Sequence, residues 1–320
     1  MRFFVVISVV LLLIGIPSGA IAQQSTEGMI SGQVFNGTEG GGSVGGVVIT
    51  LLTYVDNMLS DTRTTEADPE GKFQFRNVNI EHSYVVSARY MDVDYYYPVT
   101  FESGETTVYV EVGVCDTTTS DDKIRVGLTR KIVNIDEESL LVTEVYWLAN
   151  DGDRTYLGAD GVLFFHLPSG SYCFAAPDEL MTDYQLSEDN VVSYLVPFPP
   201  GDRQLIYSYR LAKPDSHEID LTLAIDYPSD IVELMVQSDD IEVSVSQLAP
   251  AEPIVTDTGE RYIYFQGKNF SRNDVINVRL FSISMGNVFP WYVLGIIAAV
   301  AIAGMAVYMV VRKRKAGNHE

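Results

Sequence analysis

The chain is poor in the residues that most often carry chemistry or cross-links. Its 320 residues include only two cysteines, four histidines and two tryptophans. Three of the histidines, His82, His166 and His217, stand alone, without the spacing that a metal site requires. From this scarcity we predict a protein that is not an enzyme, with no catalytic residue, no metal ligand and no bound cofactor.

Basic residues are also scarce. The chain holds 21 lysines and arginines against 43 aspartates and glutamates, which gives a net charge of −22 at pH 7. A surface with this charge repels nucleic acid and anionic lipid headgroups. Nucleic acid is therefore not expected as a partner, whereas solubility, cation association or a basic partner would suit the acidic surface.

The two cysteines leave two interpretations open. In an oxidising compartment, Cys115 and Cys173 could form a single disulfide. Their separation in the sequence says nothing about their distance in space. The alternative is a pair of buried thiols.

Hydrophobic runs mark the two ends of the chain. Residues 3–16 follow a basic residue and lead into a proline and the small residues Ala20 and Ala22. This arrangement is typical of a secretory signal peptide that is cleaved after Ala22. The run is short for a membrane span, because a spanning helix needs about 20 apolar residues. We therefore expect residues 1–22 to be removed on export.

Residues 288–311 form the second run, which carries no charge and is long enough to cross a bilayer with some tilt. Four consecutive basic residues follow it in the tail, 312–320, and are typical of a cytoplasmic end. We expect one transmembrane helix that anchors the protein in the lipid bilayer, with the bulk of the chain outside the cytoplasm. Small residues at Gly295, Ala299 and Ala303 would allow another helix to pack closely.

The sequence between these ends favours β-structure. Long helical periodicity is absent from residues 28 to 285, and short alternating or β-branched runs are separated by turn residues. We expect an all-β ectodomain with a first β-sandwich over residues 23–113 and a polar linker over residues 114–127. A larger β-sandwich, or two adjoining ones, would then occupy residues 128–285.

The first of these units carries a recognisable pattern. Its parts are Gly32-x-Val34, Gly46-Val47-Val48-Ile49, Thr64-Thr65-x-x-Asp68-x-x-Gly71-x-Phe73-x-Phe75 and Tyr84-x-Val86-x-Ala88. The pattern resembles the carboxypeptidase regulatory-like domain, a small transthyretin-like β-sandwich, over about residues 28–113. Within it, Asp68 to Gly71 can form a turn whose glycine tolerates a positive φ, and Phe73 and Phe75 would share one face of the next strand. The resemblance implies no peptidase activity, because a zinc carboxypeptidase needs an HxxE motif that no histidine here begins.

The second domain has its strongest strand signal at residues 140–147. Period-two alternation divides its side chains between two faces. One face holds Leu141, Thr143, Val145 and Trp147, and the other holds Val142, Glu144, Tyr146 and Leu148.

Two patterns that sometimes carry chemistry are better explained as turns. Residues 41–45 match the GxSxG spacing around Ser43, but a nucleophile needs a strand-to-helix turn and this stretch leads into a strand. Pairs of aspartates could contribute to a structural calcium site, which needs six to eight oxygen ligands. Turn formation explains these pairs better, and calcium stays an alternative. The pairs are Asp92/Asp94, Asp121/Asp122, Asp151/Asp153 and Asp239/Asp240.

Surface features suggest contacts with other molecules. Tyr95, Tyr96 and Tyr97 are consecutive in the sequence, so their rings cannot all face the inside of one sheet. We predict an interface there, with ordinary cross-strand packing as the alternative. N-glycosylation sequons occur at Asn36 and Asn269.

Together these features predict a non-enzymatic, membrane-anchored protein of the cell envelope. Its extracytoplasmic β-domains would bind or scaffold an envelope protein or a glycan. An accessory subunit of a membrane assembly, held through the transmembrane helix, is the alternative. A cryptic hydrolase or carbohydrate-active enzyme is less well supported, because it would need carboxylates that converge in a cleft.

Overall fold

The computed structural model describes residues 26–136, 138–158, 161–213, 218–237 and 241–281. The predicted signal peptide, transmembrane segment and basic tail lie outside these residues, as do Gly295, Ala299 and Ala303. The described part is all-β, apart from one 3-10 turn, η1 (Asp178–Asp183). None of the helical structure described is long and apolar enough to span a bilayer. The all-β architecture predicted from the sequence is confirmed for this part of the chain.

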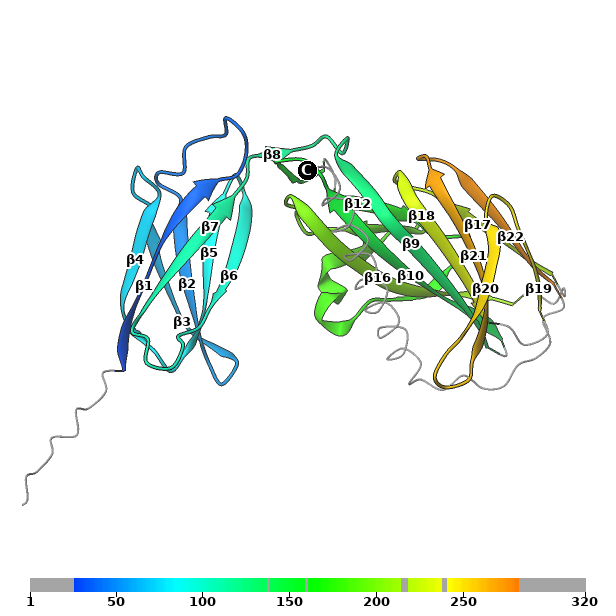
Figure 1. The fold of residues 1–320 in the computed structure, drawn as a ribbon, viewed down its shortest axis with the longest axis horizontal. Coiled ribbons are helices and arrows are strands. Elements are labelled where there is room, and N and C mark those ends of the chain that lie inside the picture. The colour runs from blue at the N-terminus through cyan, green and yellow to red at the C-terminus, as the bar shows by residue number, and fades with distance from the viewer. Residues whose placement is uncertain (1–25, 137, 159–160, 214–217, 238–240, 282–320) are drawn as a thin grey trace, which may run out of the picture. The chain divides into compact units, whose positions relative to one another are not determined.

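The chain folds as two compact units. Among the described residues, the first comprises residues 26–34, Gly45–Ala88 and Tyr96–Val112, and the second comprises Phe35–Val44, Arg89–Tyr95 and those between residues 113 and 281. Figure 1 shows strands β1 to β7 in blue to cyan and the later strands in green to orange.

Two sheets make up the first sandwich. One has the strand order β4-β1-β7 and the other has the order β3-β2-β5-β6. The strands are β1 (Glu27–Asn36), β2 (Val48–Val55), β3 (Met58–Glu66), β4 (Lys72–Asn79), β5 (Ser83–Tyr90), β6 (Val93–Val99) and β7 (Thr107–Val114). Alternation along the strands buries one side chain in two between the sheets, among them Ile30, Val34, Ile49, Leu51, Phe73, Phe75, Val86 and Val112.

The turn before β4 has the predicted geometry. Gly71 has a φ of +81°, and its N–H donates to the Asp68 carbonyl oxygen over 2.8 Å. The Asp68 carboxylate accepts hydrogen bonds from the N–H groups of Glu70 and Lys72. Phe73 and Phe75 are both buried, so the turn places two phenylalanines of β4 on the core face.

Gly32 allows three strands to approach closely at the centre of the first sheet. A Cβ atom on this residue would lie 2.2 Å from the Val110 carbonyl oxygen and 2.6 Å from the ring of Phe73. Real Cβ contacts are not this short, so any larger residue must push β7 or the Phe73 ring away.

Replacement of Gly32 by alanine is therefore expected to destabilise the first unit by about 1–3 kcal/mol, the usual cost of overpacking a core. Differential scanning calorimetry of the full chain should show the transition of this unit at a lower temperature. The matched control is Gly37→Ala, where the nearest atom would lie at an ordinary 3.4 Å. Equal effects of the two substitutions would contradict the packing argument.

The second unit is built on a seven-stranded sheet with the order β13-β16-β10-β9-β18-β21-β20. Its strands are β9 (Ile124–Ile135), β10 (Ser139–Asn150), β13 (Tyr172–Ala175), β16 (Gly201–Ala212), β18 (Ser229–Gln237), β20 (Ala249–Val255) and β21 (Arg261–Phe270). All neighbours whose register is given are antiparallel except β9 and β18, which run parallel.

Two three-stranded sheets share the main core of this unit with the large sheet. Their orders are β12-β15-β14 and β17-β22-β19. The strands are β12 (Leu163–His166), β14 (Tyr184–Leu186), β15 (Val191–Tyr194), β17 (Glu218–Ala224), β19 (Glu242–Val245) and β22 (Val275–Phe281). The core is aromatic, with Tyr146, Phe165, Tyr184, Tyr207 and Tyr227 in ring-to-ring contact.

The segment predicted as a linker, residues 114–127, contains regular structure. It includes the last residue of β7, the short strand β8 (Thr117–Thr118) and the start of β9. β8 pairs in parallel with β11 (Thr155–Tyr156), which follows the turn after β10. The polar, threonine-rich residues predicted as a linker therefore take part in a short β-ribbon.

Candidate functional site

Two adjacent basic residues of β9, Arg130 and Lys131, organise the polar chemistry of the large sheet. Successive side chains of a strand point to opposite faces, so the two cations lie on opposite sides. Each is in register with a glutamate of a different neighbouring strand: Lys131 with Glu144 of β10, and Arg130 with Glu233 of β18. We call the two sides the Lys131 face and the Arg130 face.

On the Lys131 face, one carboxylate collects four hydrogen-bond donors. The Lys131 ammonium lies 2.6 Å from Glu144 Oε1, and the side chains of this pair are 2% and 0% exposed. Tyr209 donates to the same oxygen over 2.8 Å. Tyr207 donates to Glu144 Oε2 over 3.0 Å, and Tyr146 also donates to it. The register of β10 with β16 supplies this geometry, since Glu144 lies opposite Tyr207.

These contacts fix the charge state of the cluster. Burial raises the pKa of Glu144, but the Lys131 ammonium and the tyrosine hydroxyls outweigh it and hold the pKa of this carboxyl below its ordinary value. Burial, together with the charge of Glu144, raises the pKa of Tyr146, Tyr207 and Tyr209 well above ordinary tyrosine. The cluster is thus an ion pair with three neutral phenols, closed to solvent, and its role is structural.

On the Arg130 face, a second carboxylate is bound in a similar way. Arg130 Nε donates to Glu233 Oε2 over 2.7 Å, while Tyr264 and Gln266 of β21 donate to Oε1 over 2.7 and 3.2 Å. The Arg130 guanidinium lies 5.5 Å from the ring centroid of Trp147, at cation–π distance. Burial and the bonded Glu233 carboxylate raise the pKa of Tyr264.

Apolar groups flank this charged centre. One cluster joins Leu128, Val145 and Trp147 with Ile206 and Ile231, and another joins Ile132, Met235 and Tyr262 with Ile254 and Tyr264. Tryptophan, tyrosine and arginine are the residues that most often carry binding energy in protein interfaces. The Arg130 face therefore has the composition of an interface core.

Three polar side-chain atoms on the same face have no hydrogen-bond partner among the described residues. The atoms are Asn134 Nδ2, Thr143 Oγ1 and Trp147 Nε1, all buried. Strand alternation places Thr143 with Trp147, and Asn134 with Ile132, on the Arg130 side of the sheet. A buried polar atom without a partner costs about 1–3 kcal/mol, so these three atoms lower the stability of the sheet locally.

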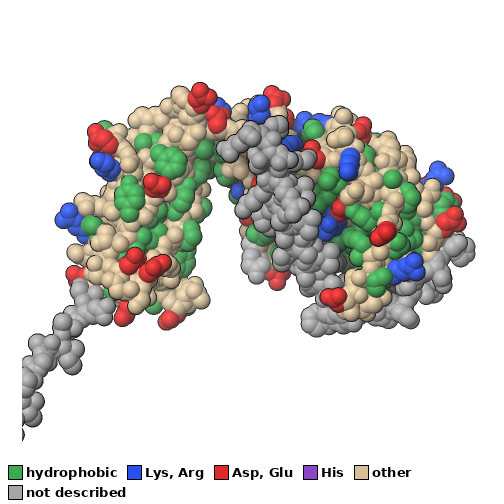
Figure 2. All heavy atoms as spheres, in the orientation of Figure 1, with side chains coloured by type: hydrophobic (Ala, Val, Ile, Leu, Met, Phe, Trp, Pro, Cys, Tyr) green, Lys and Arg blue, Asp and Glu red, His purple; other side chains and the backbone are tan. Residues whose placement is uncertain are grey.

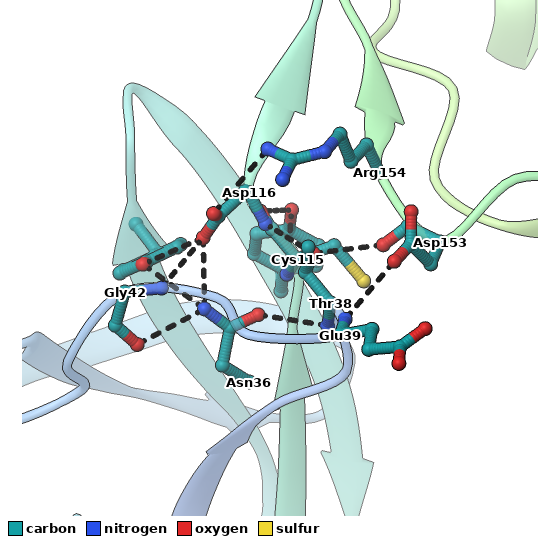
Figure 3. A network of polar contacts seen from close by, with 10 residues as sticks. Asn36, Thr38, Glu39, Gly42, Cys115, Asp116, Asp153 and Arg154 are labelled. Carbon is teal, nitrogen blue, oxygen red and sulfur yellow. Dashed lines mark hydrogen bonds and ion pairs between the residues drawn. The ribbon is translucent and has the colours of Figure 1, made fainter.

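A third polar cluster surrounds Asp116, just after β7 (Figure 3). Its Oδ1 accepts hydrogen bonds from Asn36 Nδ2 over 2.8 Å, from the Tyr90 hydroxyl over 2.9 Å and from the Gly42 N–H over 3.2 Å. Arg154 lies 3.4 Å from Oδ2. The Asn36 amide is the main cause that lowers the pKa of the Asp116 carboxyl. Every residue of this cluster belongs to the second unit.

Thr38 extends the Asp116 cluster. Its hydroxyl donates to the Asp153 carbonyl oxygen over 2.8 Å and accepts from the Asp116 N–H over 2.9 Å. The Asp153 carboxylate accepts from the Glu39 N–H over 2.9 Å. The glycine-rich loop that contains Ser43 is therefore held by hydrogen bonds to Asp116 and Asp153, in agreement with its interpretation as a loop.

The acidic pairs considered for calcium are largely occupied by arginines. Asp92 and Asp94 both pair with Arg89. Asp151 pairs with Arg125, and Asp121 with Arg272. Asp239 and Asp240 lie outside the described residues. In the part of the chain that the structure describes, no three histidine, cysteine or acidic side chains gather as a metal site.

The two cysteines are free thiols in the structure. Cys173 is exposed on β13 with a φ of +49°, whereas Cys115 is partly buried. Burial is the main cause that raises the pKa of the Cys115 thiol, which disfavours the reactive thiolate. Cys115 and Cys173 are therefore not joined in a disulfide in this structure. Of the two thiols predicted to be buried in that case, only Cys115 is partly buried.

The three consecutive tyrosines of β6 separate as strand alternation requires. Tyr95 is buried, and its hydroxyl lies 2.6 Å from Thr155 Oγ1 and 2.9 Å from the Cys115 carbonyl oxygen. Tyr96 is 62% exposed. Only Tyr96 is thus fully available for the predicted interface. Other exposed side chains on the first unit include Met58, Leu59 and Tyr109, and hydrophobic side chains are visible on this unit in Figure 2.

One polar pair had no signal in the sequence. His166 lies at the end of β12, and its ring atom Nδ1 is 2.5 Å from Asp226 Oδ1. The backbone N–H of His166 donates to Asp226 Oδ2 over 3.1 Å. A histidine oriented by a carboxylate is half of a nucleophile-activating arrangement. Among the described residues, no serine, threonine or cysteine side chain forms a hydrogen bond to this ring. The pair joins β12 to the segment after β17.

Comparisons with known proteins identify no family. No family model and no curated protein matches the chain. Solved structures that match include a provisionally named protease from Parabacteroides distasonis ATCC 8503, with a TM-score of 0.33, 10% identity and coverage of 51% of this chain. The match spans only 41% of that protease structure. The full-length major pilin SpaD from Corynebacterium diphtheriae matches with a TM-score of 0.23, 11% identity and coverage of 78% of this chain and 81% of the pilin.

Substitution of Glu144 by alanine is expected to destabilise the second unit by about 3–5 kcal/mol, because it leaves the buried Lys131 ammonium without a counter-charge. Urea unfolding followed by the fluorescence of Trp147 measures the change. The double variant Lys131→Met with Glu144→Leu removes both charges and should lose much less stability. If the double variant were as unstable as the single one, the buried charge would not be the cause.

The stability of the second unit should also depend on pH through Glu144. Its pKa is lower in the folded than in the unfolded chain, so its contribution is complete above the unfolded value, about 4.3, and is lost as the pH falls below it. Urea midpoints between pH 3 and pH 6 should therefore fall more steeply in the wild type than in Glu144→Gln. Parallel slopes would contradict the assignment of a lowered pKa.

Proposed function

We propose that the chain is a non-enzymatic, membrane-anchored protein of the cell envelope whose β-units lie outside the cytoplasm and bind a partner protein or glycan. The observation that carries the binding role is the composition of the Arg130 face. Trp147 and two tyrosines surround the ion pair of Arg130 with Glu233, and three buried polar atoms have no hydrogen-bond partner among the described residues. The anchoring role is supported by the apolar segment 288–311 and the basic residues after it.

We also propose that the first unit is a carboxypeptidase regulatory-like domain, the family that its sequence resembles. Support comes from its two packed β-sheets, from the Asp68 to Gly71 turn and from the two phenylalanines that this turn places in the core. Such a module would serve as a spacer or an additional binding surface, since fold alone does not specify activity.

The Lys131 cluster, on the opposite face of the sheet, would support the binding role by holding β9 in place. A binding surface is most effective when its residues are held in place before the partner arrives, because less conformational freedom is lost. Lys131 and Arg130 are adjacent in β9, so the ion pair on one side fixes the strand from which the guanidinium projects on the other. We infer a rigid rather than an adaptable binding face.

Anchoring is tested with a chain that ends after residue 287. The full chain should stay in the membrane pellet after carbonate washing, whereas the shortened chain should be released into the medium, because only the full chain has an apolar segment of spanning length. Protease added to intact cells should cleave the β-units of the full chain. Release of the full chain by carbonate, or protection from the protease, would contradict the proposal.

Binding is tested by photo-crosslinking on the membranes in which the protein resides. The photoreactive residue p-benzoylphenylalanine replaces Tyr264, at the edge of the Arg130 face, in one variant and the exposed Tyr109 of the first unit in another. We expect a specific adduct from position 264 and none from position 109, since aromatic-rich, desolvated centres carry most binding energy. An adduct from position 109 alone would transfer the binding role to the first unit.

A further inference from the structure

The two glycosylation sequons stand in opposite structural settings. In N-glycosylation, the asparagine Nδ2 forms a bond to C1 of the first sugar, and the C1–O bond to a lipid pyrophosphate carrier breaks. The nitrogen loses one proton and the lipid pyrophosphate leaves. The acceptor nitrogen and the serine or threonine hydroxyl two residues later must therefore both be accessible to the enzyme, with room for a sugar beside the nitrogen.

At Asn36 neither requirement is met. Its Nδ2 donates to Asp116 Oδ1 over 2.8 Å and lies 3.1 Å from both the Gly42 carbonyl oxygen and the Tyr90 hydroxyl, as Figure 3 shows for the labelled residues. A Cβ atom on Gly41 would lie 2.4 Å from this nitrogen, so no space remains for a sugar. Thr38 is 4% exposed, and its hydroxyl is bound to Asp153.

At Asn269 both requirements are met. This residue lies near the end of β21, where Asn269 and Ser271 are both exposed while Phe270 between them packs in the main core. Within the described residues, the Asn269 side chain forms no hydrogen bond that a glycan would have to break. The buried phenylalanine would hold the acceptor position against the sheet.

We propose that the folded chain accepts an N-linked glycan on Asn269 and that its fold excludes one from Asn36. The inference rests on the proposed function in one respect, because the transferring enzymes meet only exported chains. The substrate is a lipid-linked oligosaccharide, and the product is a glycan on the second unit, at the end of the strand that pairs with β18.

Asparagine has a second, purely structural reason to occupy position 269. Its φ is +60°, in the left-handed region that asparagine and aspartate tolerate better than most residues. The experiment must separate this reason from modification. Asn269→Asp keeps a residue suited to the backbone and removes the acceptor nitrogen, whereas Ser271→Ala keeps the asparagine and breaks the sequon.

The full chain, purified in detergent, is incubated with a single-subunit oligosaccharyltransferase and its lipid-linked oligosaccharide, and glycopeptides are mapped by mass spectrometry. We expect a glycan on Asn269. The occupancy at Asn36 should be lower than at Asn269 by a factor of about ten or more, because several hydrogen bonds must break there first. Synthetic peptides of residues 31–43 and 264–276 should both be modified, which shows that the enzyme accepts both sequons. Asn269→Asp and Ser271→Ala should lose the glycan, and Ser271→Thr should keep it.

Two results would overturn the inference. One is equal or greater occupancy at Asn36 in the folded chain. The other is an unmodified Asn269 when the peptide of residues 264–276 is modified in the same assay. Neither result depends on export, because the purified enzyme meets the purified chain directly. Failure of the anchoring experiment would count against the proposed function alone.

Discussion

The buried contact between Lys131 and Glu144 is the interaction on which the second unit depends. An ammonium and a carboxylate that are almost fully withdrawn from water cost several kcal/mol each unless every lone pair and proton is satisfied. Here the carboxylate receives three tyrosine hydroxyls besides the ammonium. The cluster is therefore costly to disturb, and it fixes the register of β9 and β16 against β10.

A consequence of this arrangement is that the two faces of one sheet acquire different roles. The Lys131 face is closed by the two small sheets and packs as a core rich in aromatic rings. The Arg130 face repeats the same chemistry with a looser shell, in which glutamine, tyrosine and tryptophan surround the ion pair. Because neighbouring residues of β9 supply both cations, the position of one face is tied to that of the other. This link between the two faces of the sheet is the physical basis of the proposed binding role.

Much of the fold follows from sequence periodicity, and the exceptions have physical reasons. Alternation correctly divided β10 into a face with Val142 and Tyr146 and a face with Val145 and Trp147. The edge strands β3 and β20 were not predicted, because β3 is mostly polar and exposed and β20 contains two prolines. The parallel pairing of β9 with β18 and the Asp116 cluster join residues far apart in the chain, and no local pattern specifies such contacts. The two ion pairs likewise could not be predicted from the sequence, because they depend on the strand register that places each glutamate beside its cation.

The most direct test of the account is hydrogen–deuterium exchange of the backbone amides in the full chain. If the opposed ion pairs make the centre of the large sheet the most stable part of the second unit, amides of β9 and β10 should exchange last, while those of β19 and β20 exchange early. Exchange in β9 and β10 as fast as in β20 would contradict the claim that the Lys131 and Glu144 contact holds this unit together.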